Sequence, residues 1–188
     1  HDNTAWSSDS VTTSMTNRAG VLVRNAERSE VIKAALMAGA DRVTHDTTSA
    51  DLLNYRRSAT DQTANGLDRR YGAGQLNARN SYWILAAGEQ GSTEDGNAAA
   101  NVASRGFDYD PYFGGSSGSN TTATYPLPVD TVPRLLTAAL VWNLDINGGT
   151  ASSLNPAATL RDLNLEVLDL SEAGNPVVMS SQSTIENT

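Results

Sequence analysis

The stretch GLDRRYGAGQLNARNSYWIL, residues 66–85, decides how the first half of this chain folds. Gly72 and Gly74 indicate a turn, because glycine adopts backbone conformations that other residues avoid. Asn77 then stands where a helix N-cap is favoured, and apolar residues follow it at helical spacing. The pattern predicts a helix that begins at Asn77 and ends at Gly88.

A second helix is predicted over ERSEVIKAALMAGA at 27–40, and a short third one over SADLLNYRRS at 49–58. Ser29 is a suitable N-cap, Glu30 favours the positive end of the helix dipole, and Gly39 stands where helices usually stop. The helices at 27–40 and 77–88 are apolar on one side only, so we expect them to pack against each other. The expected contacts are Trp83, Leu85, Ile32 and Leu36, with Tyr82 also in the core.

After residue 125 the hydrophobic period changes to that of strands. Strands are predicted over 133–146, 160–170 and 175–181, with turn-forming residues between them. The buried side of the middle strand is expected to consist of Leu163, Leu165, Val167 and Asp169. This alternation is typical of a half-buried antiparallel sheet. Trp142 is expected at a buried strand position.

Helices followed by strands indicate an α+β chain made of two units. We expect a helical part at 1–90, a connector at 91–125 and an antiparallel β-sandwich at 126–188. The connector is rich in glycine and serine and contains too little apolar surface to pack by itself. Within it, DYDPYF at 108–113 could line a ligand surface, but an ordinary packed loop explains the same residues.

The composition excludes several classes of function. The formal charge of the 188 residues is −8 and no Lys/Arg run exists, which argues against nucleic acid or an anionic membrane as a partner. The absence of cysteine excludes disulfides, thiolate metal sites and cysteine nucleophiles. No apolar stretch is long enough to span a bilayer. Abundant Ser, Thr, Asn and Gly with few Lys are typical of a secreted protein.

Two parts of the sequence resemble subtilisin-like serine peptidases. EVIKAALMAGA followed by GLDRRYGAGQLNARNSYWIL is similar to the last helices of that family's catalytic domain, where a YGAGQLNA-type turn introduces the closing helix. LTAALVWNLD, LRDLNLEVLD and VVMSSQSTIENT are similar, in the same order, to a C-terminal jelly-roll domain found in some of these peptidases. The resemblance covers about 27–188. It implies the end of a subtilisin-like α/β domain followed by a jelly-roll-like β-sandwich.

The family's catalysis needs an Asp, a His and a Ser, with a donor for the oxyanion. In TTSMTNRAGVLV at 12–23, Ser14 is the candidate nucleophile, although the family's Gly-Thr-Ser order and its proline are missing. A polar stretch that happens to contain a serine explains Ser14 better than this incomplete motif does, and we favour that interpretation. The only other histidine besides His1, His45, follows Ser14 in the chain, and its neighbour Asp46 is poorly placed to orient it.

Calcium is the one cofactor that the sequence suggests. NLDING at 143–148 places Asn143, Asp145 and Asn147 at the spacing of a calcium loop. The bidentate glutamate that should follow is replaced by Leu154, and a turn between strands explains the same residues.

Two functions remain open at this point. The resemblance implies a fragment of a secreted subtilisin-like serine endopeptidase, inactive alone, whose partners are the remainder of the same polypeptide or a peptide or protein substrate. The alternative is a non-catalytic β-sandwich binding module with a helical preface. As a fragment, the isolated chain is expected to be weakly protected and prone to aggregation.

Overall fold

The structure is a computed structural model of the 188-residue chain. It describes residues 18–42, 67–91, 102–111, 121–128, 135–143, 145–148 and 161–181, together with positions 16, 113, 153 and 157–159. For 145–147 and 157–159 only the backbone is described. The helix expected over 49–58 lies outside these residues.

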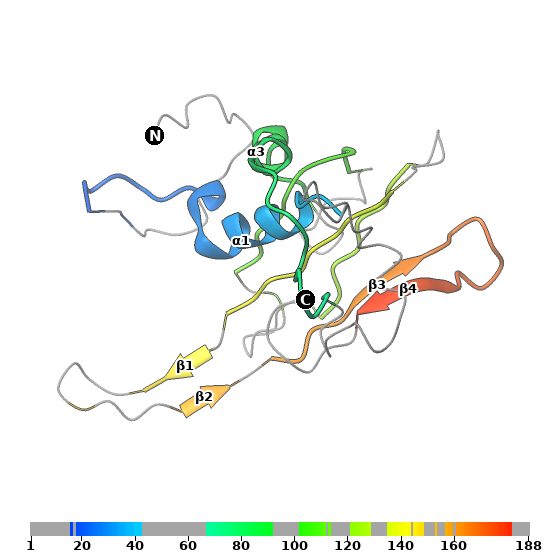
Figure 1. Ribbon diagram of the computed structural model, residues 1–188. Helices are drawn as coiled ribbons and strands as arrows, with labels where there is room; N and C mark the ends of the chain where they lie inside the picture. The colour runs from blue at the N-terminus through cyan, green and yellow to red at the C-terminus, as the bar shows by residue number, and fades with distance from the viewer. Residues whose placement is uncertain are drawn as a thin grey trace. The chain divides into compact units, whose positions relative to one another are not determined.

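The described residues form a mixed α+β structure, as the sequence predicts (Figure 1). In chain order its elements are the 3-10 helix η1 (Asn25–Glu27), the helices α1 (Ser29–Ala38) and α3 (Ala78–Ala87), and the strands β1 (Asp145–Asn147), β2 (Ala157–Thr159), β3 (Leu165–Leu168) and β4 (Val177–Ser181). Within the described part the strands make two antiparallel pairs, β1–β2 and β3–β4. These pairs do not by themselves make a sandwich, so the jelly roll stays a prediction.

The chain divides into two compact units that interleave along the sequence. Unit 1 consists of His1–Asp41 and Leu76–Ala139, and unit 2 consists of Arg42–Gln75 and Leu140–Thr188. The linear division expected at residues 90 and 126 stays a prediction.

The helix α3 of unit 1 begins as its sequence predicts. The Asn77 side-chain oxygen accepts a hydrogen bond from the Asn80 amide at 3.0 Å, which satisfies one of the amides that a helix start leaves free. At the other end, Gly88 has a φ of 95°, and its amide bonds to the Leu85 carbonyl at 3.1 Å. Glycine is favoured here because a side chain strains this backbone conformation. The predicted cap and the predicted stop are both confirmed.

The start of α1 differs from the prediction by one residue. Arg28, in an extended conformation, is the N-cap, whereas Ser29 is the first helical residue and its hydroxyl lies 3.0 Å from a Glu30 carboxylate oxygen. The 3-10 helix η1 explains why the cap lies one residue earlier than predicted. Because η1 ends at Glu27, Arg28 alone joins η1 to α1, and Ser29 falls inside α1. The Arg24 amide donates to the Glu27 carboxylate at 2.9 Å, which closes this turn. The predicted stop at Gly39 is confirmed.

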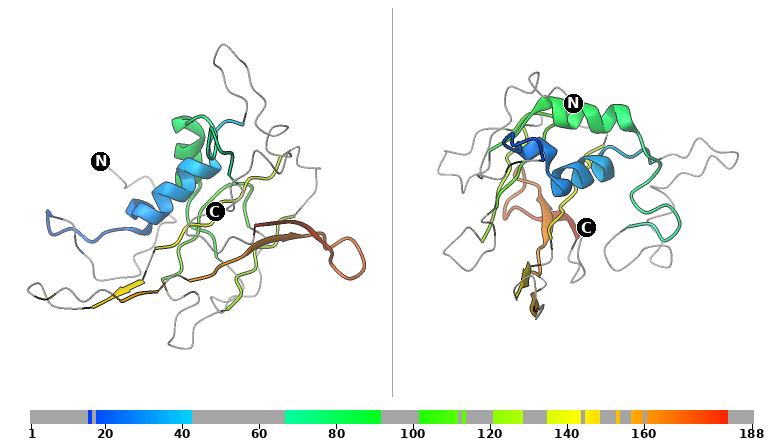
Figure 2. Two further views of the ribbon diagram at one scale, coloured as in Figure 1. Left: turned by 60° about the horizontal axis from the view of Figure 1, so that its bottom comes forward. Right: turned by 90° about the vertical axis from the view of Figure 1, so that its left-hand side faces the viewer.

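The helices α1 and α3 pack against each other, as expected, and Figure 2 shows them side by side from two further directions. Their contact is made by small residues. A β-carbon built on Gly39 would lie 2.7 Å from both the backbone nitrogen and the hydroxyl of Ser81. Ala35 and Ser81 are buried beside it, at 2% and 4% exposure. The two backbones therefore approach too closely for a large side chain to lie between them.

Most of the residues predicted to be buried in this contact are exposed, so that part of the prediction is wrong. Trp83 is 45% exposed, Tyr82 is 50% exposed, and Ile32 and Leu36 are each 40% exposed. Tyr82 and Trp83 instead make an edge-to-face ring contact at 5.3 Å on the surface. These larger side chains are exposed, whereas small residues lie at the close approach of the two helices. Of the predicted contacts, Leu85 alone packs toward the core.

Gly39→Ala tests the close approach. The φ of Gly39 is −79°, which alanine adopts without strain, so in open space the substitution would stabilise the fold by about 0.4–1 kcal/mol. Because the new methyl group would overlap the Ser81 backbone, we expect instead a loss of about 1–3 kcal/mol in the free energy of unfolding. Urea denaturation measures it. An unchanged or raised stability would contradict the described contact.

The core of unit 1 draws on the segment expected to be a connector. Phe107 is 8% exposed and clusters with Ala26 and Val31, and Ile84, Leu85 and Tyr109 pack against this cluster. The backbone fixes the position of Phe107. Its amide donates to the Gly88 carbonyl at 3.2 Å, and its carbonyl accepts from the Gln90 amide at 2.7 Å. The described residues 102–111 therefore form a packed loop. This agrees with the interpretation of DYDPYF as an ordinary packed loop.

In unit 2, the glycine-rich turn ahead of α3 is closed by hydrogen bonds. Asp68 and Gly72 exchange backbone hydrogen bonds of 3.1 and 2.9 Å, and Gly72 has a φ of 58°. One carboxylate oxygen of Asp68 accepts from the amides of Arg70 and Tyr71, both at 2.7 Å. This oxygen thus holds the turn in place, whereas the second carboxylate oxygen of Asp68, Oδ2, is buried without a hydrogen-bond partner among the described residues.

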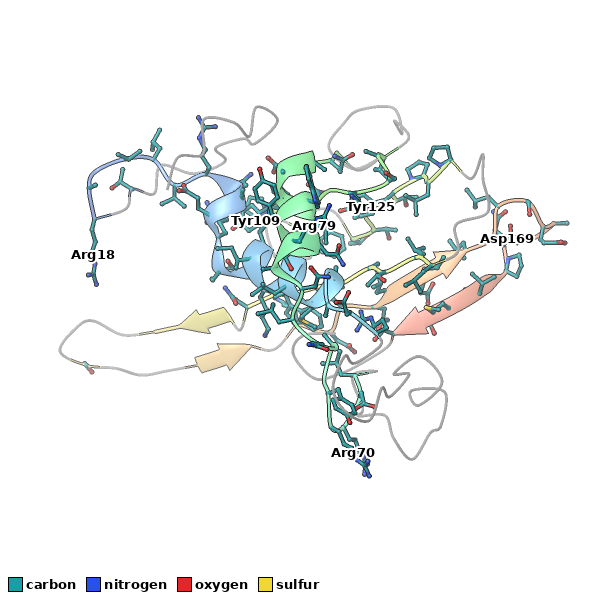
Figure 3. The ribbon with its side chains drawn as sticks, turned by 45° about the horizontal axis from the view of Figure 1, so that its top comes forward. Arg18, Arg70, Arg79, Tyr109, Tyr125 and Asp169 are labelled. Atoms are coloured by element: carbon teal, nitrogen blue, oxygen red, sulfur yellow. The ribbon has the colours of Figure 1, made fainter. Side chains whose placement is uncertain are left out.

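The β3–β4 hairpin of unit 2 confirms the predicted alternation. Residues 161–170 alternate between partly buried and exposed, and the partly buried set is that expected for one side of the strand. In the ladder, Leu165 lies opposite Ser181 and Val167 opposite Met179, with a bulge after Val167. Asp169, labelled near the turn in Figure 3, accepts hydrogen bonds from the amide and hydroxyl of Ser171 at 2.9 and 2.6 Å.

The strand expected over 133–146 is shorter than predicted. Residues 135–143 run without a strand ladder, and only Asp145–Asn147 form β1. Trp142 is nevertheless buried, as expected, at 8% exposure. Its indole nitrogen donates to the Arg161 carbonyl at 3.0 Å, so this side chain is held by a hydrogen bond as well as by packing.

Candidate functional site

The candidate catalytic residues of the sequence cannot be placed. Ser14 lies outside the residues that the structure describes, and so do His45 and Asp46. The assignment of Ser14 as a nucleophile therefore stays a prediction.

The candidate calcium ligands lie at and before strand β1. The backbones of Asp145 and Asn147 are extended and pair with Thr159 and Ala157 of β2, while Asn143 is exposed just ahead of the strand. Among the described residues there is no group of three or more His, Cys, Asp or Glu side chains that could hold a metal ion. The calcium site stays a prediction.

A calcium titration tests it. With one carboxylate among its three suggested ligands, the site should bind only in the range of about 10⁻⁴–10⁻³ M. The melting temperature is expected to rise with calcium in the wild-type chain and to rise less in Asp145→Ala. If calcium raises the melting temperature of both proteins equally, the ions bind elsewhere.

The structure draws attention instead to a buried polar group in unit 1, here named the Asn25 network: Asn25, Arg28, Glu89 and Tyr109. Asn25 is fully buried, and its amide nitrogen donates to a Glu89 carboxylate oxygen at 2.6 Å. Its side-chain oxygen accepts from the Arg28 guanidinium nitrogen Nε at 3.3 Å. The Arg28 guanidinium in turn lies 4.4 Å from the centre of the Tyr109 ring.

Three segments bring these side chains together. The turn η1 places Asn25 and Arg28 on one side, because a 3-10 helix repeats every three residues. The chain reversal at Gly88 delivers Glu89. The pairing of residues 88–90 with Phe107 then places Tyr109 two residues further on.

The loop around Tyr109 is itself held by hydrogen bonds. One Asp108 carboxylate oxygen accepts from the Tyr109 amide at 2.8 Å, and the other accepts from the Tyr125 hydroxyl at 2.7 Å. Figure 3 shows the positions of both tyrosines. The ring of Tyr109 is therefore fixed from its own backbone as well as by Arg28.

The electrostatics of Tyr109 favour its neutral form. Burial raises the pKa of the Tyr109 phenol above its ordinary value of 10.0, Arg28 opposes this shift, and Glu30 and Asp110 reinforce it. A raised pKa means that the folded chain holds this proton more tightly than the unfolded chain. The protonated phenol therefore contributes to the stability of the fold below the ordinary pKa of 10.0. This contribution is lost as the pH rises through the raised pKa of the folded chain. At neutral pH Tyr109 cannot act as a base.

The arrangement is suited to holding segments together. Arg28 and Glu89 carry opposite charges and each bonds to Asn25, so this buried amide links a buried guanidinium to a partly buried carboxylate. The buried hydroxyl of Ser81 is also engaged, since it donates to the Asn77 carbonyl at 3.0 Å. The Asn25 network itself contains no hydroxyl or thiol nucleophile next to a base at neutral pH, so we assign it a structural role.

Sequence reasoning missed the Asn25 network. The spacing of three between Asn25 and Arg28, just ahead of an apolar stripe, was the available signal. This spacing does not predict the other two members, Glu89 and Tyr109, which are distant in the sequence.

Comparisons of the chain with protein-family models, with curated proteins and with solved structures find no match. Within the described residues, no helix combines the length and the apolar character needed to cross a membrane.

Proposed function

We propose that the chain is the C-terminal part of a secreted subtilisin-like serine endopeptidase, without peptidase activity of its own. In this proposal 1–90 completes the catalytic domain and 126–188 belongs to a jelly-roll β-sandwich that stabilises it. The sequence resemblance to that family supports both assignments.

The observation that carries the proposal is the arrangement of the two helices. The resemblance implies a helix, a glycine turn and a closing helix, and the one-sided apolar stripes of the two helices predict that they pack together. The described residues contain α1, the Asp68–Gly72 turn and the Asn77-capped helix α3, and α3 packs on α1. The alternation at 161–170 is likewise the pattern that a sandwich strand requires.

The decisive experiment is to determine the coding sequence around this segment and to express the whole protein. We expect Asp and His motifs of the subtilisin type ahead of the segment, and labelling of the whole protein by a serine-directed fluorophosphonate probe. A gene that encodes neither motif, or a whole protein that the probe does not label, would refute the proposal.

The chain by itself is expected to hydrolyse no peptide bond. A serine nucleophile needs a base, and the chain offers Ser14 without a histidine in the family's context. The measurement is the release of fluorescent peptides from labelled casein, with Ser14→Ala as the matched control. Steady hydrolysis that is blocked by a serine-directed inhibitor and lost in Ser14→Ala would show that the chain carries its own catalytic site.

One observation favours the second candidate, a non-catalytic binding module. The β3–β4 hairpin exposes several large apolar side chains, as a binding surface does. They are Leu168, Leu170, Val177, Val178 and Met179. The same gene sequence discriminates the candidates, because a binding module needs no peptidase motifs.

A further inference from the structure

Two exposed arginines lie in the glycine-rich turn of unit 2. Arg69 and Arg70 are both exposed, and Figure 3 shows the Arg70 side chain directed away from the ribbon of the turn. Exposed turns are where proteolytic cleavage concentrates. Trypsin-like peptidases cleave after arginine, because a carboxylate in their binding pocket pairs with the guanidinium. The turn therefore contains two peptide bonds of suitable sequence, Arg69–Arg70 and Arg70–Tyr71.

A single carboxylate oxygen engages both of these peptide bonds. The amide of Arg70 belongs to the first bond and that of Tyr71 to the second, and both donate to Oδ1 of Asp68 at 2.7 Å. Asp68 and Gly72 close the turn around them with backbone hydrogen bonds of 3.1 and 2.9 Å. A peptidase binds its substrate in an extended conformation, which this closed turn does not allow. The two bonds are therefore exposed in sequence but protected in conformation.

The position of the Asp68 carboxylate in the closed turn is partly unfavourable. Asp68 is 2% exposed, and its Oδ2 is buried without a hydrogen-bond partner among the described residues. The loss of hydration at Oδ2 opposes the gain from the two hydrogen bonds of Oδ1. Rotation of the carboxylate into water satisfies Oδ2 and releases both amides at once. The open turn is therefore closer in free energy to the closed turn than two charge-assisted hydrogen bonds alone imply.

We propose that the turn at Arg69 and Arg70 is a cleavage site for a trypsin-like serine peptidase, and that Asp68 controls access to it. When Asp68 releases the two amides, the segment extends and the peptidase hydrolyses the bond after Arg69 or Arg70. One water molecule is consumed. Its hydroxyl group goes to the carbonyl carbon of the arginine, and its hydrogen goes to the nitrogen of the next residue.

Cleavage in this turn should leave unit 1 joined. The cut separates α1 from α3 along the chain, but the two helices still pack together. The Asn77 side chain also donates to both carboxylate oxygens of Asp41 at 3.0 Å, which ties the start of α3 to the end of α1. We therefore expect the two pieces to stay associated in native buffer and to separate in denaturant.

Limited digestion of the 188-residue chain with trypsin tests the proposal, and mass spectrometry identifies each cleaved bond. Asp68→Ala removes the acceptor of both amides. Loss of one hydrogen bond to a charged group already raises the population of the open turn about tenfold. Because cleavage follows this population, we expect the bonds after Arg69 and Arg70 to be cut at least about tenfold faster. Asp68→Asn keeps an acceptor oxygen and should accelerate the cuts much less.

Gly72→Ala opens the turn by a second route. A β-carbon built on Gly72 meets no atom within 4 Å, so the substitution strains the φ of 58° and leaves Asp68 in place. This strain should raise the rate of both cuts about fivefold or more. The bond after Arg105, in the packed loop of unit 1, is the internal reference, and its rate should not change.

Unchanged rates after Arg69 and Arg70 in Asp68→Ala would overturn the proposal, and so would the absence of any cut in this turn. An equal acceleration after Arg105 in both variants would overturn it as well, because Asp68 and Gly72 would then act on the whole chain. The added trypsin supplies the activity, so these results are independent of the proposed function.

Discussion

Trp142→Ala is expected to lower the free energy of unfolding of unit 2 by about 3–5 kcal/mol, the usual cost of truncating a buried aromatic side chain. The indole is 8% exposed, so its removal leaves a cavity that the surroundings refill only in part. The substitution also removes the donor to the Arg161 carbonyl. Urea denaturation, read out through hydrogen exchange of the β3 amides, measures the effect.

Trp83→Ala is the matched control, because it makes the same substitution at a side chain that is 45% exposed. We expect a loss of less than about 1 kcal/mol there. Trp142→Phe keeps one aromatic ring but removes the hydrogen-bond donor and part of the buried volume. Its cost should lie between about 1 kcal/mol, that of one hydrogen bond, and the loss expected for Trp142→Ala. Equal losses for Trp83→Ala and Trp142→Ala would contradict the described burial.

Asn25→Leu is expected to cost about 3 kcal/mol, because it removes hydrogen bonds to two charged groups at a fully buried position. Leucine has the same branched arrangement of side-chain heavy atoms and a larger volume, so it leaves no cavity, and the loss comes from the missing hydrogen bonds and from crowding by its methyl groups. Arg28 is buried and loses this partner with little water to replace it, whereas Glu89 is only partly buried. Urea denaturation of unit 1 provides the measurement.

Two further variants test that explanation of the Asn25 result. Glu89→Gln keeps an oxygen that can accept the hydrogen bond from Asn25, so it should cost about 1 kcal/mol or less. Asn25→Asp places a second carboxylate against Glu89, and it should destabilise the fold more at neutral pH than at acidic pH, where the pair becomes protonated. A neutral effect of Asn25→Leu would show that the Asn25 network contributes nothing to stability.

Features that depend on neighbouring residues were predictable from the sequence. The cap at Asn77, the stops at Gly39 and Gly88, and the alternation along 161–170 are all confirmed. Each follows from the conformational preference of one residue or from the two-residue repeat of a strand.

Features that depend on contacts between segments distant in the sequence were not predictable in the same way. The pattern predicted that α1 and α3 would meet, but not that Gly39 and Ser81 would lie at their close approach while Trp83 is exposed. The Asn25 network joins three segments separated by up to 84 positions, from Asn25 to Tyr109, and the local spacing of Asn25 and Arg28 does not reveal its other two members. The candidate nucleophile Ser14 lies outside the described residues, so its role stays a prediction.

The interleaving of the two units has a consequence for how the chain folds during its synthesis. The first part of unit 2, Arg42–Gln75, emerges from the ribosome before the second part, which begins at Leu140. At about 5–20 residues per second, the intervening segment takes about 3–13 s to make. During this interval the early part of unit 2 has none of its later partners, while unit 1 reaches its last residue, Ala139. Unit 1 is therefore synthesised completely before unit 2. Unit 2 can form only after the residues from Leu140 onward have been made.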